Sequence, residues 1–172
     1  YSFDLRSILR SYATTQEHLR DVVIKTNQLF CDDTKESGNF VTAFLALYDS
    51  KKQSLQYVNC GHNYPFIKRA TGEVIKLETK GIAFGVDNIS EVDVKMIDLH
   101  PGDFIVMYTD GITEAQNKQE ELYTEERLVE IIKASNFDNP EALSNEIISG
   151  VEEFTGGADQ YDDMTMIVIK IK

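Results

Sequence analysis

The order of hydrophobic patterns along the chain constrains its fold more than any other feature of the sequence. Patterns with helical spacing come in two pairs, and a block of strand-like patterns lies between the pairs. The helical segments cover residues 3–13, 19–30, 125–134 and 140–155. The strand block runs from 40 to 109, and one more apolar segment, 164–171, ends the pattern. This order predicts an α+β fold with a largely antiparallel sheet covered by helices. We find no repeat and no linker, and therefore expect a single domain over residues 1–172.

Local signals predict where several of these elements begin. Thr14-Thr-Gln-Glu17 resembles a capping box in front of the second helical segment. Thr124 is expected to cap the third, and Asn139-Pro140 has the N-cap and first-turn residues typical of a helix start. The continuous apolar run 40–48 predicts a buried strand.

Composition excludes several classes of protein. The net charge of −12 argues against a nucleic-acid surface, which would carry a basic stripe. No apolar run approaches the roughly 18 residues of a membrane span, so we expect no membrane contact. Cys31 and Cys60 are too few for a disulfide framework, and we read both as reduced thiols in a cytoplasmic chain.

Common catalytic signatures are absent from the sequence. It contains no phosphate-binding P-loop, no Gly-x-Ser-x-Gly elbow and no His-Glu-x-x-His metal motif. Neither cysteine has the arginine six residues later that a thiol phosphatase needs. His62 lies in a turn with Gly61 and Pro65, where a loop-bracing hydrogen bond is a simpler interpretation than catalysis.

Aspartates at strand ends offer a more specific hypothesis. Asp110 follows the apolar segment 104–109, and Asp162 and Asp163 precede the last apolar segment. Each position alone is typical of a turn. If the two segments are antiparallel neighbours, however, these carboxylates converge at one end of a sheet. Close carboxylates need a proton or a cation between them, and oxygen ligands suit Mg²⁺ or Mn²⁺.

Five ordered motifs resemble one known family. They are Phe40-Val-Thr-Ala-Phe44, Tyr57-Val-Asn-Cys-Gly-His-Asn-Tyr-Pro65, Gly81-Ile-Ala-Phe-Gly85, Leu99-His-Pro-Gly-Asp-Phe-Ile-Val-Met-Tyr-Thr-Asp-Gly-Ile-Thr-Glu-Ala115 and Asp162-Asp-Met-Thr165. In this order they are similar to the metal-dependent protein phosphatases (the phosphatase 2C or PPM superfamily), in the bacterial SpoIIE/RsbU-like branch.

The resemblance implies a β-sandwich flanked by helices, with a binuclear Mn²⁺ or Mg²⁺ centre. A metal-activated water would hydrolyse phosphoserine or phosphothreonine in a phosphoprotein substrate, such as a phosphorylated anti-sigma-factor antagonist. Asp110 and Asp162 match the family's catalytic metal ligands. Gly111, Asp163, Thr165 and His62 are assigned as residues that support the site.

One departure from the family pattern concerns the first strands. Family members begin with strands that carry a Gly-Asp and an Asp-Gly-x-Gly motif, and this sequence shows no equivalent of them. We therefore expect an N-terminally truncated phosphatase domain with weak or partial metal binding and little activity of its own. Exposed sheet edges would favour self-association. An alternative is a non-catalytic binding module that recognises a partner through residues 81–91 and 115–124. A haloacid-dehalogenase-type phosphatase is disfavoured because Ile112 stands where that chemistry needs a second acid.

Overall fold

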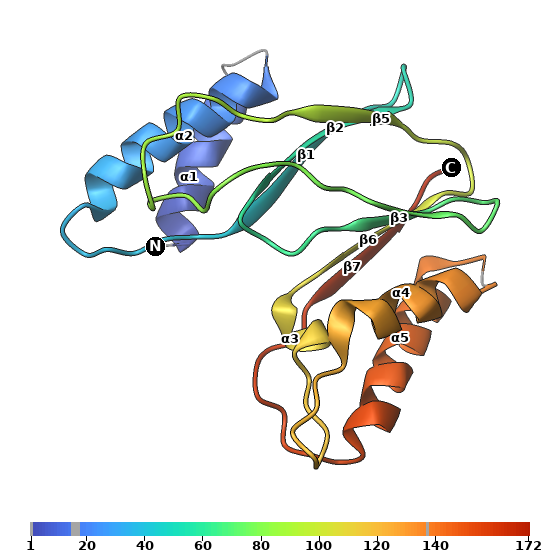
Figure 1. Cartoon of the computed structure of the whole chain (residues 1–172). Coiled ribbons are helices and arrows are strands. Elements are labelled where there is room, and N and C mark those ends of the chain that lie inside the picture. Colours follow the sequence, from blue (N-terminus) through green and yellow to red (C-terminus); the bar gives the residue numbers. More distant parts are fainter. Residues whose placement is uncertain (1, 15–17, 137) are drawn as a thin grey trace. The chain divides into compact units, whose positions relative to one another are not determined.

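The computed structural model describes residues 2–14, 18–136 and 138–172 (Figure 1). The chain forms two compact units. The first consists of Tyr1–His62 and Glu78–Asp98, and the second of Asn63–Leu77 and Leu99–Lys172. Each unit contains one sheet, and all strand pairs in both sheets are antiparallel. The predicted mixture of helices and antiparallel sheets is confirmed.

The first unit combines two helices with a three-stranded sheet. The helices are α1 (Ser2–Ala13) and α2 (Leu19–Thr34), and the strands, in their order across the sheet, are β1 (Ala43–Asp49), β2 (Ser54–Cys60) and β5 (Lys95–Asp98). Apolar side chains of the helices, including Val23 and Phe30, pack with Val58, Cys60 and Phe84 into one core. The predicted capping box includes residues 15–17, which lie outside the described residues.

The apolar run at 40–48 differs from its prediction as a buried strand. Strand β1 begins at Ala43 and its second half is exposed, with Leu47 51% and Tyr48 42% accessible. The reason is its position, because β1 pairs with β2 alone and forms an edge of the described sheet. The central strand β2 is the buried one. An apolar edge without a charged residue before Asp49 agrees with the predicted self-association, which stays a prediction.

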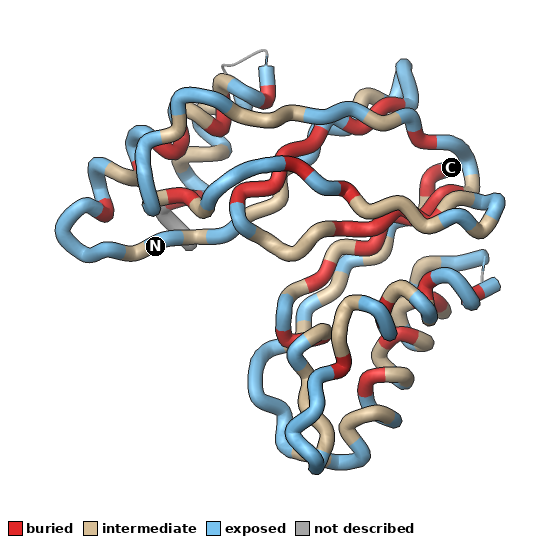
Figure 2. The backbone as a smooth tube through the Cα atoms, in the orientation of Figure 1, coloured by how far each residue is buried: buried red, intermediate tan, exposed pale blue. Residues whose placement is uncertain are grey.

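The second unit combines a four-stranded sheet with three helices. In their order across the sheet the strands are β4 (Val74–Lys76), β3 (Phe66–Lys68), β6 (Phe104–Tyr108) and β7 (Met166–Lys170). The helices are α3 (Asp110–Thr113), α4 (Thr124–Ala134) and α5 (Pro140–Thr155). The core joins Phe66, Val106 and Tyr108 of the sheet to buried side chains of the helices, namely Ile112, Leu128, Ile132, Leu143, Ile147 and Val151. Figure 2 shows buried residues along both the strands and the helices of this unit.

The two longer helices of this unit begin differently. Asn139 caps α5 as predicted, because its Oδ1 accepts a hydrogen bond of 2.7 Å from the backbone N–H of Ala142 and Pro140 follows it. Thr124 does not cap α4. It is the first helical residue, with φ at +74°, and it follows the buried Tyr123, whose N–H is bonded to the carbonyl of Ala115. The start of α4 is therefore fixed by the buried Tyr123 and its backbone hydrogen bond rather than by a polar side-chain cap.

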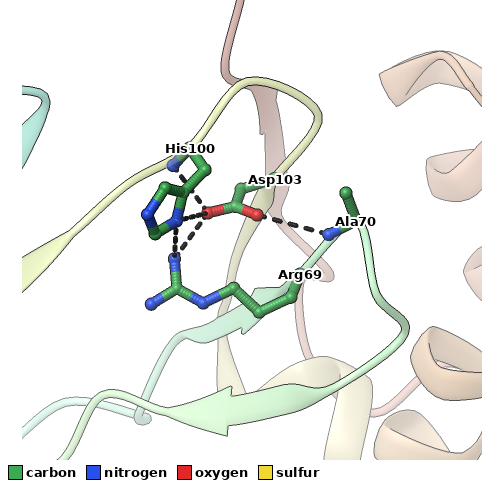
Figure 3. Close-up of polar contacts among 4 residues, drawn as sticks. All are labelled: Arg69, Ala70, His100 and Asp103. Atoms are coloured by element: carbon green, nitrogen blue, oxygen red, sulfur yellow. Dashed lines mark hydrogen bonds and ion pairs between the residues drawn. The ribbon is translucent and has the colours of Figure 1, made fainter.

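A buried aspartate fixes the turn in front of β6 (Figure 3). Asp103 is only 1% exposed, and its Oδ2 accepts from the backbone N–H of His100 at 2.9 Å and from Arg69 Nη1 at 2.5 Å. Its Oδ1 accepts from the N–H of Ala70 at 3.3 Å. This carboxylate thus joins the 100–103 turn to the end of β3 inside the second unit.

Candidate functional site

The pairing of β6 with β7 brings the aspartates predicted from the sequence to the same end of a sheet. The two strands pair antiparallel, from Phe104 opposite Lys170 to Tyr108 opposite Met166. The last residue of β6 therefore faces the first residue of β7. Both aspartates lie beyond this same end of the ladder, Asp110 two residues after Tyr108 and Asp162 four residues before Met166. The condition set in the sequence analysis, that these two strands are antiparallel neighbours, is therefore met.

Thr109 joins the two chain segments beyond the ladder. Its backbone N–H donates to the carbonyl of Thr165 at 3.0 Å, and its hydroxyl donates to the carbonyl of Asp163 at 3.1 Å. The same hydroxyl oxygen accepts from the N–H of Thr165 at 3.0 Å. One side chain thus holds the segment in front of β7 against the segment that follows β6. Our sequence analysis did not assign a role to Thr109, since its partners are more than fifty residues away.

Gly111 lets these two backbones approach closely. A Cβ atom placed on Gly111 would lie 2.5 Å from the carbonyl oxygen of Asp163 and 2.9 Å from its carbonyl carbon. Real Cβ contacts are essentially never this short, and a backbone atom cannot swing away as a side-chain end can. The position therefore requires glycine for space. The Asp-Gly and Asp-Asp-x-Thr motifs are consequently in direct backbone contact.

The two predicted ligands are exposed and have few partners within the chain. Asp110 is the first residue of α3, and its Oδ1 accepts from the N–H of Gly111 at 3.1 Å. The Oδ1 of Asp162 accepts from the N–H of Asp163 at 2.7 Å. These bonds come from the next residue in the chain and leave other lone pairs open to solvent. This state contrasts with Asp103, whose oxygens face donors from three residues.

The carboxylates of Asp110 and Asp162 are ligands of the type that a hard divalent cation prefers, but there are too few of them to hold one tightly. Carboxylate oxygens are ligands that Mg²⁺ and Mn²⁺ accept. Within residues 2–14, 18–136 and 138–172, however, no group of three or more His, Cys, Asp or Glu side chains is arranged to hold a metal ion. The described residues therefore do not form a complete metal site.

Comparison with known proteins decides the family. The sequence family described as Stage II sporulation protein E (SpoIIE) matches residues 1–172. The chain belongs to the SpoIIE family. The chain spans less than half the length of each of the two curated relatives described next. Protein IcfG of Synechocystis sp. is 29% identical over 147 residues, which are 84% of this chain and 23% of IcfG. Phosphoserine phosphatase RsbU of Bacillus subtilis is 26% identical over 155 residues, which are 87% of this chain and 44% of RsbU.

Solved structures confirm the predicted fold class. The PP2C phosphatase domain of SpoIIE from Bacillus subtilis, solved with a fragment of its regulatory domain, matches 97% of this chain and 49% of that one. The TM-score is 0.80 at 21% identity. A manganese-presoaked crystal of the SpoIIE phosphatase domain matches 97% of this chain and 71% of that one, with a TM-score of 0.64 at 26% identity. The mixed fold with antiparallel sheets is thus that of PP2C phosphatase domains.

The supporting residues predicted from the SpoIIE-family motifs fall into both units. Gly111, Asp163 and Thr165 lie together through the backbone contacts described above, and their roles toward a metal stay predictions. His62 belongs to the first unit. The side chain of Asn59 bonds both the N–H and the carbonyl of His62, at 2.8 and 2.7 Å, and the His62 ring lies 3.2 Å from the Thr42 hydroxyl. Asn59 therefore braces this loop of the SpoIIE-family motif, and the role of His62 in the site stays a prediction.

The cysteines behave as expected for a chain without thiol chemistry. Both are free, and Cys60 is buried in the core of the first unit. Burial raises the pKa of the Cys60 thiol to about 12, so it stays protonated and is a poor nucleophile at neutral pH. No helix in the described parts of the chain is long and apolar enough to cross a membrane.

Proposed function

We propose that this chain is part of a phosphoserine/phosphothreonine phosphatase domain of a bacterial signalling regulator. The observation that carries the proposal is the direct backbone contact between the Asp110-Gly111 and Asp162-Asp163 segments, fastened by Thr109. Membership of the SpoIIE family and similarity to phosphoserine phosphatase RsbU support the reaction class. The proposed substrate is a phosphorylated protein, such as an anti-sigma-factor antagonist.

The proposed roles of the residues follow from their chemistry. Asp110 and Asp162 would hold Mn²⁺ or Mg²⁺ through their exposed carboxylates. A bound divalent cation supplies an acidified water and neutralises charge on a phosphoryl group. Thr109 and Gly111 would help to fix the separation of the two carboxylates, because they hold the backbone segments next to Asp110 and Asp162 together. No covalent phosphoenzyme is proposed.

Weak metal binding by this chain alone is a further part of the proposal. Two carboxylates leave most of the six ligand positions of a divalent cation to water, so affinity should be low. The binuclear centre implied by the family resemblance needs additional acidic ligands, which the described residues do not gather.

The test compares matched aspartate variants in Mn²⁺ binding and catalysis. Mn²⁺ binding is measured by calorimetry, and hydrolysis of p-nitrophenyl phosphate and of a phosphoserine peptide is measured with Mn²⁺. We expect weak binding and low or no turnover in the unchanged chain. Both should fall in Asp110→Asn and Asp162→Asn, and stay unchanged in Asp159→Asn, a nearby exposed control. Mn²⁺ binding that is equal in all four proteins would contradict the assignment.

A second candidate function is a non-catalytic binding module with the phosphatase fold. The observation that favours it is the absence of a three-ligand metal cluster among the described residues. It would recognise a partner through residues 81–91 and 115–124. Tight stoichiometric Mn²⁺ binding, or turnover lost in Asp110→Asn, would exclude this candidate.

A further inference from the structure

The segment that carries Asp110 connects the end of β6 to the start of α4. It covers residues 109–124 and includes the short helix α3, which begins at Asp110. Its second half is closed by a hydrogen bond of 2.8 Å from the N–H of Tyr123 to the carbonyl of Ala115. Helix α3 contacts α4, as Figure 1 shows. The position of Asp110 therefore depends on how the start of α4 is held.

One carboxylate, that of Glu125, joins the first turn of α4 to two strands of the same sheet. Its Oε2 accepts a hydrogen bond of 3.3 Å from the hydroxyl of Tyr108, the last residue of β6. Its Oε1 accepts from Nζ of Lys76 in β4 at 2.6 Å. Tyr108 directly precedes the 109–124 segment and Glu125 directly follows it. The bond between them thus ties the two ends of this segment together.

Both partners of Glu125 come from ordered surroundings. Tyr108 is 3% exposed, and its ring stacks on Phe66 with 6.0 Å between the ring centres. The Tyr108 hydroxyl is also hydrogen-bonded to the side chain of Asn63. The side chains of Lys76 and Glu125 are 31% and 35% exposed, so this ion pair is partly shielded from water. Hydrogen bonds that carry a charge are stronger than neutral ones. Glu125 is therefore held in one orientation, toward the end of β6.

Thr124 indicates that the start of α4 needs such contacts. Its φ is +74°, in the left-handed region, where a β-branched residue is strained. Strain of this kind persists only where the surrounding structure outweighs it. The two neighbours of Thr124 supply these contacts, because Tyr123 is buried and Glu125 is bonded to Tyr108 and Lys76. Without the bonds of Glu125, we expect Thr124 to relax and the first turn of α4 to loosen.

We propose that Glu125 is a positioning residue for Asp110. It holds the start of α4 to the end of β6, and thereby keeps α3 and the Asp110 carboxylate next to the Asp163 segment. Lys76 keeps the Glu125 carboxylate in place for Tyr108. The inference rests on the proposed function, in which Asp110 binds a divalent cation. Glu125 acts through Asp110, and no contact with a metal or a substrate is proposed for it.

The first measurement is amide hydrogen exchange of the 172-residue chain without metal. Glu125→Gln removes the charge and one acceptor oxygen, and Tyr108→Phe removes only the hydroxyl. The reporters are the N–H groups of Thr109 and Glu114, which donate to the carbonyls of Thr165 and Asp110. Relative to the amides of β3, their exchange should become about fivefold faster in both variants, the factor that one hydrogen bond contributes.

The second measurement is a Mg²⁺ titration that follows the amide shifts of Gly111 and Asp163. A segment that is ordered for a smaller fraction of the time binds more weakly by that fraction, so the dissociation constant should rise about fivefold in both variants. Glu130→Gln, an exposed position on the same helix, should match the unchanged chain in both measurements. Asp110→Asn should lose the Mg²⁺-dependent shifts.

The outcomes separate this proposal from the proposed function. Absence of Mg²⁺-dependent shifts in the unchanged chain contradicts the proposed metal site, and the exchange rates then decide the role of Glu125 on their own. The positioning role is overturned if exchange at Thr109 and Glu114 rises no more than at β3 in both variants, because that pattern shows a general loss of stability. A folded Glu125→Gln chain that binds Mg²⁺ as tightly as the unchanged chain overturns it as well.

Discussion

Two regions of the second unit use aspartate in opposite ways. In the turn before β6, Asp103 is buried and accepts hydrogen bonds from His100, Ala70 and Arg69 (Figure 3). At the opposite end of β6, Asp110 is exposed, and the described donor to its carboxylate is the N–H of the next residue.

The comparison separates bracing carboxylates from those available to a ligand. Donors from the chain occupy Asp103, which therefore stabilises the fold, whereas Asp110 and Asp162 keep lone pairs for a cation. Burial by itself does not identify a functional acid in this protein, because Asp103, the most buried aspartate whose exposure is described, braces a turn.

The largest effect on stability is expected from Asp103→Asn. The substitution removes the negative charge that pairs with the Arg69 guanidinium, whose side chain is 14% exposed. Breaking one side of a buried ion pair costs about 3 kcal/mol of the free energy of unfolding. Urea denaturation measures this loss, and the exposed Asp159→Asn should change stability by less than about 0.5 kcal/mol. An equally small change in Asp103→Asn would remove the distinction between the two regions.

An intermediate effect is expected from Gly111→Ala. The new Cβ would lie 2.5 Å from the Asp163 carbonyl oxygen, so the backbone must move apart. Such overpacking costs about 1–3 kcal/mol, and it would also separate the two aspartate segments. Thermal unfolding measures the cost. Thr113→Ala, in the same short helix, removes one exposed hydrogen bond and should change stability by less than about 0.5 kcal/mol. A Gly111→Ala chain as stable as this control would show that the approach at Gly111 is not tight.

The smallest effect on stability is expected from Asp110→Asn. Its carboxylate is exposed, and the described donor to it is the backbone N–H of the next residue, Gly111, so removing its charge breaks little. Without metal, the free energy of unfolding should change by less than about 0.5 kcal/mol. Any increase in Tm that Mn²⁺ produces in the unchanged chain should be smaller in the variant, since a ligand stabilises a protein only through the site it binds. A loss of stability as large as that of Asp103→Asn would assign Asp110 a bracing role instead.

The sequence predicted the elements of the fold better than their surroundings. Period and apolar runs identified both helix pairs and the strands β6 and β7, because these signals are local. The same run at 40–48 was wrongly predicted as buried. An apolar sequence is compatible with a central strand and with an edge strand. The structure shows that this strand pairs with β2 alone and therefore lies at an edge.

Some residues of the candidate site could likewise be predicted from the sequence, and others could not. Asp110, Gly111 and Asp162 could be found from motifs, since the residue types appear in the sequence at the ends of strands. Thr109 could not be found in this way, because its hydroxyl forms hydrogen bonds with Asp163 and Thr165, and their position next to Thr109 depends on the β6–β7 register. Asp103 was passed over for the same reason, since its partners at Arg69 and Ala70 lie on another hairpin.

By itself, the sequence determined the kinds and order of the elements and the family, whereas the structure decided the pairing of β6 with β7. Tertiary structure alone decided which polar groups are satisfied. Asp103 accepts hydrogen bonds from three other residues, Asp110 accepts one from the next residue, and the Tyr123 hydroxyl is buried with no hydrogen-bond partner among the described residues. The physical reason is that helices and strands arise from short-range periodicity. A polar atom's partners come instead from residues far along the chain that only folding brings within hydrogen-bond distance.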